Sequence, residues 1–423
     1  MDAQGLRSTI QSGALDQKLT ALYGADGLEQ AKERCLNAIE TYLGIFSNSP
    51  SLSLFSSPGR VELLGNHTDH NAGIVMAGAV NIDILAVVSP SEEPVIRIKS
   101  EGYDLVTVDL RDLSPQPEET THSASLIRGM AFRFQQAGRK IGGFTAYTTS
   151  NVPKGSGLSS SAAFEVLTGT ILNELYGGKA TPVEIAKDAQ FAENVYFDKP
   201  SGLMDQMACA VGNVVKIDFQ KADAPVITPL SLDLTAAGCR LVVVSTGDNH
   251  ADLTDCYAAI PQEMKSVAAL FDQPVLRGIS LEQLMENAGK IRAKCGDRAL
   301  LRAIHFVTEN DRVEAAAAAL EKSDFSAFCR EVSASGRSSV LALQNIYPPQ
   351  DPQHQGVTLD LAAASTLLGE EGAFRVHGGG FGGTILAVVP QQKIPVFVSR
   401  MEQLSGKGCC KILSFRQGAC KVI

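Results

Sequence analysis

No run of apolar residues in this sequence approaches the ~20 residues that a helix needs to cross a bilayer. The first twenty residues, MDAQGLRSTIQSGALDQKLT, also lack the apolar core of a signal peptide. We therefore expect no membrane partner and a cytoplasmic location.

Positive charge is in deficit. The chain has 37 Lys and Arg against 46 Asp and Glu, which gives a net charge of −9. A protein that binds nucleic acid by neutralising phosphates needs the opposite balance, so we expect no nucleic-acid partner. The same deficit argues against a basic helix lying on a membrane surface.

Paired cysteines at zinc-knuckle spacing are absent. None of the nine cysteines forms a CxxC motif, and the number is odd. Cys409 and Cys410 are adjacent, which is poor geometry for a simple bridge. Reduced and mostly buried thiols are the expected state.

The 423 residues allow two or three domains at about 150 residues each. Helical spacing of apolar residues predicts two helices within residues 15–46, with a break around Gly24 and Gly27. Strand patterns and helical patterns then alternate. The expected strands are 51–57, 73–80, 83–89, 95–100, 144–150, 214–219, 239–247, 384–390 and 410–415, and the expected helices are 160–176, 181–196, 280–295, 297–320 and 324–345.

The segment 220–238, QKADAPVITPLSLDLTAAG, is interpreted as a connection between domains. We therefore expect two α+β domains divided near residue 225. The predicted boundaries are an N-terminal helical extension over 1–45, a first domain over 46–225 and a second over 226–423.

A glycine- and serine-rich loop joins the expected strand 144–150 to the expected helix 160–176. Glycines permit close backbone approach, and the free N–H groups of a helix start favour an anion. A turn with a serine cap is the simpler alternative, but three consecutive serines exceed what a cap requires. The loop has neither the GxxxxGK[ST] pattern nor a complete GxGxxG, so it predicts a phosphate site of another kind. Its residues are Pro153, Lys154, Gly155, Ser156, Gly157, Leu158, Ser159, Ser160 and Ser161.

A second glycine cluster, HGGGFGG at 377–383, directly precedes the strand 384–390. Five glycines in six positions indicate tight packing against another loop or a ligand.

The stretch GNHTDHNAG, residues 65–73, places two histidines and an aspartate within four positions. A transition-metal site is one interpretation, but no nearby Cys or His run supplies further ligands. A structural turn is another, and imidazoles and carboxylates also bind sugar hydroxyls.

These motifs together resemble the GHMP small-molecule kinases, and in particular their galactokinase branch. PKGSGLSSSAA is similar to the ATP-phosphate loop, HGGGFGG to the third motif, and SPGRVELLGNHTDHNAGIV to the first galactokinase motif. SGLMDQMAC resembles the segment with the catalytic aspartate, and LRAIHFVTENDRVEAAAAAL and the terminal QGA resemble later galactokinase segments. The matches run in order from about residue 52 to 423.

The resemblance implies a two-domain α+β GHMP kinase fold with the active site between the domains. It implies phosphorylation of the anomeric hydroxyl of a sugar with ATP and Mg²⁺, commonly by a monomer. Asp205 would be the catalytic base, and Arg60 would keep it ionised and stabilise the transferring phosphoryl group. Ser161 and Glu193 would hold Mg²⁺.

The same resemblance places sugar-binding residues in three segments. His67 and Asp69 of the first motif, Gly202 beside the catalytic aspartate, and Tyr257 would line the sugar. Asn66 occupies the position at which galactokinases usually have a Glu. The resemblance implies that this Glu binds the C6 hydroxyl of the sugar.

An amide at position 66 would not repel a C6 carboxylate, so galacturonate stays open beside galactose. The segments SASGRSS (333–339) and LQNIY also look closer to plant galacturonokinase. A non-catalytic sugar and ATP sensor is a third alternative. The pair Arg60 and Asp205 favours catalysis over it.

Overall fold

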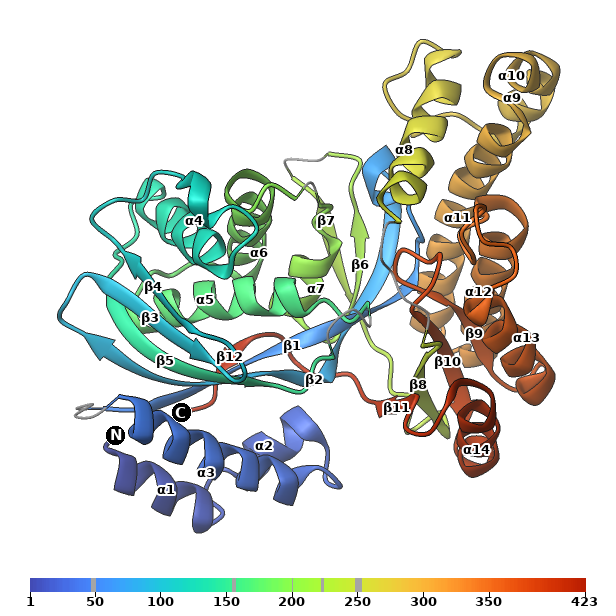
Figure 1. The fold of residues 1–423 in the computed structure, drawn as a ribbon. Coiled ribbons are helices and arrows are strands. Elements are labelled where there is room, and N and C mark those ends of the chain that lie inside the picture. The colour runs from blue at the N-terminus through green and yellow to red at the C-terminus, as the bar shows by residue number, and fades with distance from the viewer. Residues whose placement is uncertain (47–50, 154–156, 200, 222–223, 248–252) are drawn as a thin grey trace.

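The computed structural model describes residues 1–46, 51–153, 157–199, 201–221, 224–247 and 253–423. Two sheets organise it (Figure 1). The larger has eight described strands, in the order β12-β1-β2-β5-β3-β4, with β6 paired to β2 and β7 paired to β6. Its strands are β1 Ser53–Leu64, β2 Ile74–Ser91, β3 Val95–Ser100, β4 Leu105–Asp109, β5 Gly143–Ser150, β6 Val214–Asp218, β7 Val226–Leu230 and β12 Cys420–Lys421.

Helices cover both faces of this sheet (Figure 1). On one face lie α4 Ser123–Gln136, α5 Ser160–Tyr176, α6 Pro182–Phe191 with a π-helical turn Ala192–Tyr196, and α7 Met204–Val211. On the other lie α1 Ala3–Gln11, α2 Asp16–Tyr23 and α3 Leu28–Ile45. Each face has its own apolar core, because β-strand side chains alternate between the two sides of the sheet.

The second sheet has four antiparallel strands in the order β11-β8-β10-β9. They are β8 Cys239–Ser245, β9 Ala373–His377, β10 Thr384–Pro390 and β11 Cys410–Leu413. The accompanying helices are α8 Thr254–Ala269, α9 Leu281–Glu286, α10 Ala288–Cys295, α11 Asp297–Glu321, α12 Phe325–Ser338 with a π-helical turn Ser339–Leu343, α13 Gly356–Leu368 and α14 Ile394–Ser405. Short 3₁₀ turns occupy Asp69–Asn71, Pro117–Glu119 and Gln391–Lys393.

A further core joins the two halves. The later part of β1 and the early part of β2 pack against α11, α12 and the second sheet, through residues such as Val61, Met76, Val313 and Leu386. The ends of these two strands therefore carry the loop between them, residues 65–73, to the junction of the halves.

Most expected elements are present, with three differences. The runs 73–80 and 83–89 belong to one strand, β2, whose half-buried Asn81 and Ile82 interrupt the apolar pattern. The expected helix 280–295 is divided at Asn287 into α9 and α10. The segment 220–238, expected to be a connection, contains strand β7. Among the described strands β7 pairs with β6 alone, and such an edge position tolerates Pro229.

The predicted α+β class is confirmed by this arrangement. The boundaries at residues 45 and 225 stay a prediction. β7 and β12 both pair within the larger sheet, so residues beyond 225 contribute to it.

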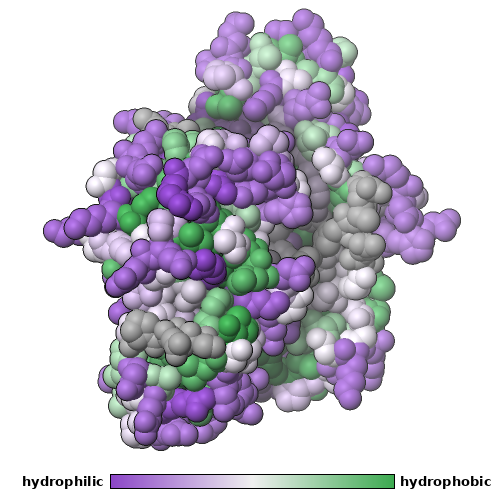
Figure 2. All heavy atoms as spheres, turned by 60° about the vertical axis from the view of Figure 1, so that its left-hand side comes forward, coloured by the Kyte–Doolittle hydropathy of each residue, from purple (hydrophilic) through white to green (hydrophobic). Residues whose placement is uncertain are grey.

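The nine cysteines are free, and most of them are buried. None of the described helices combines the length and apolarity needed to cross a membrane. On the face seen in Figure 2, hydrophilic side chains predominate, with separate groups of apolar ones between them.

Candidate active site

Arg60 and Asp205 form the centre of the site. Arg60 lies near the end of β1, and Asp205 lies in the first turn of α7. The Arg60 guanidinium donates from Nε to Oδ1 at 2.8 Å and from Nη2 to Oδ2 at 2.6 Å. Such two-point contact fixes the carboxylate in orientation as well as in charge. Burial opposes the charged form of Arg60, but the charge and hydrogen bonds of Asp205 outweigh it and raise the pKa of Arg60.

The end of the glycine- and serine-rich loop closes on this pair. Arg60 Nη1 donates to the carbonyl of Gly157, and the Arg60 N–H donates to the carbonyl of Leu158 at 3.1 Å. The hydroxyl of Ser159 donates to Asp205 Oδ2 instead of capping α5. Ser159 adopts left-handed backbone geometry at φ 60°, which is uncommon outside glycine and is often found at functional sites. The simpler interpretation, a turn with a serine cap, does not account for this arrangement.

Helix α5 begins at Ser160 directly behind this loop, so its first N–H groups are available to an anion. Gly157, Leu158, Ser159, Ser160 and Ser161 therefore lie at the start of this helix, and Pro153 precedes them in the chain. Lys154, Gly155 and Ser156 of the predicted loop lie outside the described residues.

Ser161 and Glu193 meet beside α5. The Ser161 hydroxyl lies 3.4 Å from Glu193 Oε1, and the Glu193 side chain is buried. Lys199 Nζ contacts the same oxygen at 2.5 Å, while Gln206 Nε2 donates to Oε2 at 2.8 Å. The nearby Glu165 keeps one oxygen without a partner, and burial followed by the charge of Glu193 raises its pKa well above the usual value. The Ser161 hydroxyl and the Glu193 carboxylate are hard oxygen donors of the kind that Mg²⁺ prefers.

The loop 65–73, which joins β1 to β2, lies beside Asp205. A cavity of about 150 Å³ is lined by Arg60, Glu62, Gly65, Asn66, His67, Asp69, His70, Val75, Met204, Asp205, Gly378 and Gly379. Gly202 borders Asp69 so closely that an added Cβ would lie 1.9 Å from Asp69 Oδ2. The predicted sugar-binding residues Asn66, His67 and Asp69 thus share one cavity with Asp205, and Gly202 adjoins it.

His67 is neutral in this cavity, because burial and then the neighbouring His70 lower its pKa to about 3. Its Nε2 contacts the Gly379 carbonyl at 2.8 Å, and its backbone is left-handed at φ 57°. No group of three or more His, Cys, Asp or Glu suited to a metal occurs among the residues that the structure describes.

The second glycine cluster lies between this cavity and another of about 220 Å³. The second cavity is lined by Gly157, Tyr257, His377, Gly379, Gly380, Gly382, Gly383 and Thr384. Tyr257 donates from its hydroxyl to the Gly380 carbonyl at 3.0 Å. A Cβ on Gly379 would lie 2.5 Å from the Tyr257 ring. Tyr257 therefore lines the second cavity and reaches the first only through the glycine cluster.

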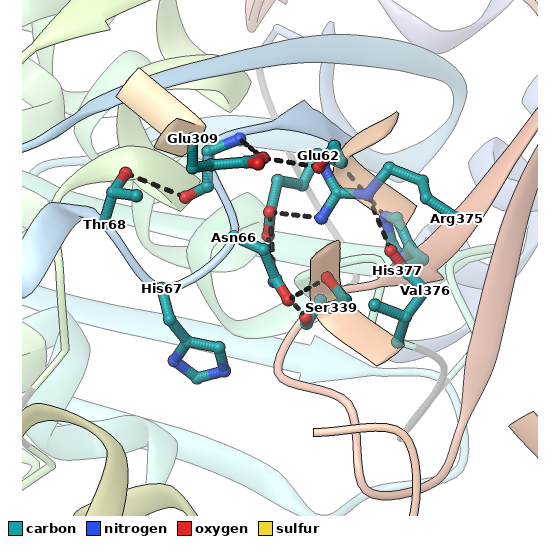
Figure 3. A network of polar contacts seen from close by, with 12 residues as sticks. Glu62, Asn66, His67, Thr68, Glu309, Ser339, Arg375, Val376 and His377 are labelled. Atoms are coloured by element: carbon teal, nitrogen blue, oxygen red, sulfur yellow. Dashed lines mark hydrogen bonds and ion pairs between the residues drawn. The ribbon is translucent and has the colours of Figure 1, made fainter. Parts of the chain in front are cut away.

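Several site residues were not singled out from the sequence. Glu62 and Arg375 form a buried network with Asn66 (Figure 3). Asn345 joins it by donating to Asn66 Oδ1 at 2.7 Å. His377 Nε2 accepts from the Glu62 N–H at 3.3 Å. Glu62 sits inside the first motif and His377 at the head of the second glycine cluster, so their positions next to recognised motifs were the available signal.

Comparison with known proteins places this geometry in a family. Residues 125–213 match the model "GHMP kinases N terminal domain", and residues 40–90 match the model "Galactokinase galactose-binding signature". The structure resembles that of Methanococcus jannaschii mevalonate kinase, with a TM-score of 0.61 at 14% identity over 87% of this chain and 99% of the other. The fold is that of a GHMP kinase.

Two similarities are more specific. A galactokinase from Streptomyces coelicolor is 32% identical over 368 residues, which are 86% of this chain and 91% of the relative. The crystal structure of Lactococcus lactis galactokinase complexed with galactose superposes with a TM-score of 0.77 at 24% identity, over 92% of this chain and 100% of the other. The chain belongs to the galactokinase family and is a sugar kinase.

Proposed function

We propose that the protein transfers the γ-phosphoryl group of ATP to the anomeric hydroxyl of galactose or a close galacto-configured sugar. The observation that carries the proposal is the two-point contact between Arg60 and Asp205, at the wall of a cavity next to the phosphate loop. The curated relative is named a galactokinase, and the structural relative was crystallised with galactose.

Asp205 acts as the general base in this proposal. Its carboxylate accepts the proton of the anomeric hydroxyl as the oxygen attacks the γ-phosphorus of ATP, and the bond between that phosphorus and the β–γ bridging oxygen breaks. Arg60 orients the carboxylate through two hydrogen bonds, and the Ser159 hydroxyl fixes one of its oxygens. His67 and Asp69 orient the sugar, with Gly202 leaving room beside Asp69 and Tyr257 holding the glycine cluster.

The loop 153–161 and the start of α5 bind the phosphates of ATP in this proposal, because free backbone N–H groups favour an anion. Ser161 and Glu193 are the proposed Mg²⁺ ligands. Mg²⁺ supplies charge neutralisation on the phosphate oxygens when bound. We further propose a monomer in the cytoplasm. The net charge of −9 supports the absence of a nucleic-acid partner.

An ATP-consumption assay with Mg²⁺ tests the proposal across galactose, galacturonate, N-acetylgalactosamine, arabinose and glucose. We expect turnover on galactose and a sugar 1-phosphate as the product, identified by phosphorus NMR. Phosphate at another carbon would contradict the anomeric assignment. ATP binding without turnover on any sugar would favour the alternative function, a non-catalytic sensor of sugar and ATP.

A further inference from the structure

The amide of Asn66 is engaged by the protein at both its nitrogen and its oxygen. Its Nδ2 donates to the Gly378 carbonyl at 2.8 Å and to Glu62 Oε1 at 3.1 Å. Its Oδ1 accepts from Asn345 Nδ2 at 2.7 Å and from the Ser339 hydroxyl at 3.4 Å. An Asn amide has two N–H donors and two acceptor positions, so both donors are occupied and Oδ1 holds one strong bond, from Asn345, and one long one, from Ser339. Asn66 therefore has no N–H donor left for a sugar.

Glu62 lines the same cavity and does have such capacity. Its Oε1 accepts from Arg375 Nη2 at 2.8 Å and from Asn66. The partner found for Oε2 is the Asn66 amide at 3.5 Å, the outer limit of a hydrogen bond. A carboxylate oxygen has two acceptor positions, so Oε2 can still receive a strong donor. Figure 3 shows Asn66 and Arg375 pointing toward Glu62, while the His67 ring points away from this network.

The charges around the cavity bear on the substrate class. Glu62, Asp69 and Asp205 are three carboxylates in its lining, and Arg60 is the one Lys or Arg among the lining residues that the structure describes. Arg60 already binds Asp205, and Arg375 behind Glu62 binds that carboxylate. With His67 neutral, a sugar carboxylate would meet a net negative lining whose guanidinium, that of Arg60, is already paired with Asp205.

We propose that Glu62 is the carboxylate that reads one hydroxyl of the sugar, that Asn66 and Arg375 position it, and that the cavity takes neutral sugars in preference to uronates. This inference rests on the proposed sugar kinase activity. Hydrogen bonds from a neutral hydroxyl to an ionised carboxylate are strong when desolvated, so Glu62 can distinguish a sugar that has the hydroxyl from one that lacks it.

The test compares galactose with its 2-, 3-, 4- and 6-deoxy analogues in steady-state kinetics of the full chain. We expect the wild type to lose kcat/KM by about 10- to 100-fold on the analogue that lacks the hydroxyl read by Glu62. Glu62→Gln should lose a similar factor on galactose and little on that analogue, with the KM for ATP unchanged. Equal losses on galactose and on every analogue would overturn the proposal, because they would indicate a supporting role alone.

Two further variants distinguish the loss of the Glu62 carboxylate from a general effect of misfolding. Glu62→Gln leaves the Arg375 charge buried and unpaired, so Glu62→Gln/Arg375→Met removes both charges and should show the same loss of discrimination. Asp188→Asn is the matched control. Asp188 is a similarly buried carboxylate paired with Arg133 and Arg139, and it is not among the lining residues of the cavity. This variant should keep the wild-type preference among the analogues.

Galacturonate provides an independent test of the charge argument. We expect its kcat/KM in the wild type to be below that of galactose, and equal or better turnover would overturn the charge argument. If the wild type neither phosphorylates nor binds galactose, as measured by calorimetry, the proposed function itself fails and the role of Glu62 fails with it. A wild type that is active on galactose without a role for Glu62 refutes this inference alone.

Discussion

Arg60 and Asp205 lie 145 positions apart in sequence and are joined by two hydrogen bonds, at 2.8 and 2.6 Å. The Arg60 side chain is almost fully buried, whereas that of Asp205 is one-third exposed toward the cavity. This asymmetry suits a carboxylate that is held from behind and open to a substrate in front.

Asp205→Asn should lower kcat by about 100-fold or more, because the amide keeps the shape of the side chain but cannot accept the proton. ATP binding, measured by calorimetry, should persist. Asp218→Asn is the matched control, since Asp218 also pairs with an arginine, Arg277, but lies outside both described cavities. Full activity of Asp205→Asn would remove Asp205 from the role of base.

Ser161→Ala should raise the Mg²⁺ concentration needed for half-maximal rate by about 10-fold, since it removes one proposed oxygen ligand. Glu193→Gln should act in the same direction. Glu174→Gln, on the exposed end of the same helix α5, serves as the control. Identical Mg²⁺ titrations in the wild type and Ser161→Ala would refute the assignment.

Gly379→Ala should lower kcat/KM for the sugar, because the new Cβ would lie 2.5 Å from the Tyr257 ring. The glycine cluster would have to shift, and this would disturb the contact between the Gly379 carbonyl and His67 Nε2. Overpacking of this kind costs about 1–3 kcal/mol. The control is Gly44→Ala in α3, where an added Cβ meets no atom within 4 Å. We expect that change to stabilise the protein by about 0.5–1 kcal/mol in urea unfolding. If Gly379→Ala has the kinetics of the wild type, the glycine cluster can shift without affecting sugar binding, which would contradict this prediction.

Acid should destabilise the protein below about pH 6.5, where unfolded histidines take up protons. Burial lowers the pKa of His305 and, with repulsion from Arg60 and Arg375, lowers the pKa of His377 well below its usual value. The unfolded chain then binds more protons than the native one, so each histidine removes up to about 1.4 kcal/mol of stability per pH unit as the pH falls.

Urea unfolding between pH 7.5 and pH 5 measures this slope. His377→Gln should reduce the slope by close to one proton, and His354→Gln, at a histidine whose side chain is 78% exposed, is the control. The same slope in His377→Gln and the wild type would show that this histidine is not held neutral.

Arg34→Ala should destabilise the protein by about 3–5 kcal/mol, because it leaves the buried Asp83 with one guanidinium fewer. Arg34 of α3 donates to Asp83 Oδ1 at 2.6 Å and to the Thr149 carbonyl at 2.7 Å. Arg7→Ala breaks an exposed pair with Glu40 in the same extension and should cost at most about 1 kcal/mol. Thermal unfolding compares them, and equal effects would contradict the role of burial.

The sequence allowed prediction of those parts of the fold in which periodicity is regular. Helices α5 and α11 were expected within a residue or two, because their apolar positions recur at helical spacing. The pattern failed where burial changes within one element. Strand β2 was divided at its half-buried centre, and β7 was missed because Pro229 and exposed Val226 do not resemble a strand.

The candidate site shows a similar limit. Short motifs gave Arg60, Asp205 and the phosphate loop, but they could not reveal which side chains engage one another. Asn66 attracted attention as a departure from the family, yet two of its four hydrogen bonds come from Asn345 and Ser339, more than 270 positions away. The sequence around Glu62 is that of an ordinary strand, and only the tertiary structure brings Arg375 beside its carboxylate. Such pairings depend on tertiary contacts that no local pattern records.

The position of β12 has a consequence for the synthesis of the protein. This strand pairs with Phe55 and Ser56, near the start of β1, and Arg416 just before it donates to Ser56. A ribosome must therefore add about another 360 residues before the strand edge made near residue 55 meets its partner. During that interval an unpaired, apolar edge is open to other chains, and such edges promote aggregation. We therefore expect the nascent chain to depend on chaperones more than the finished protein does, and late truncations to yield insoluble protein.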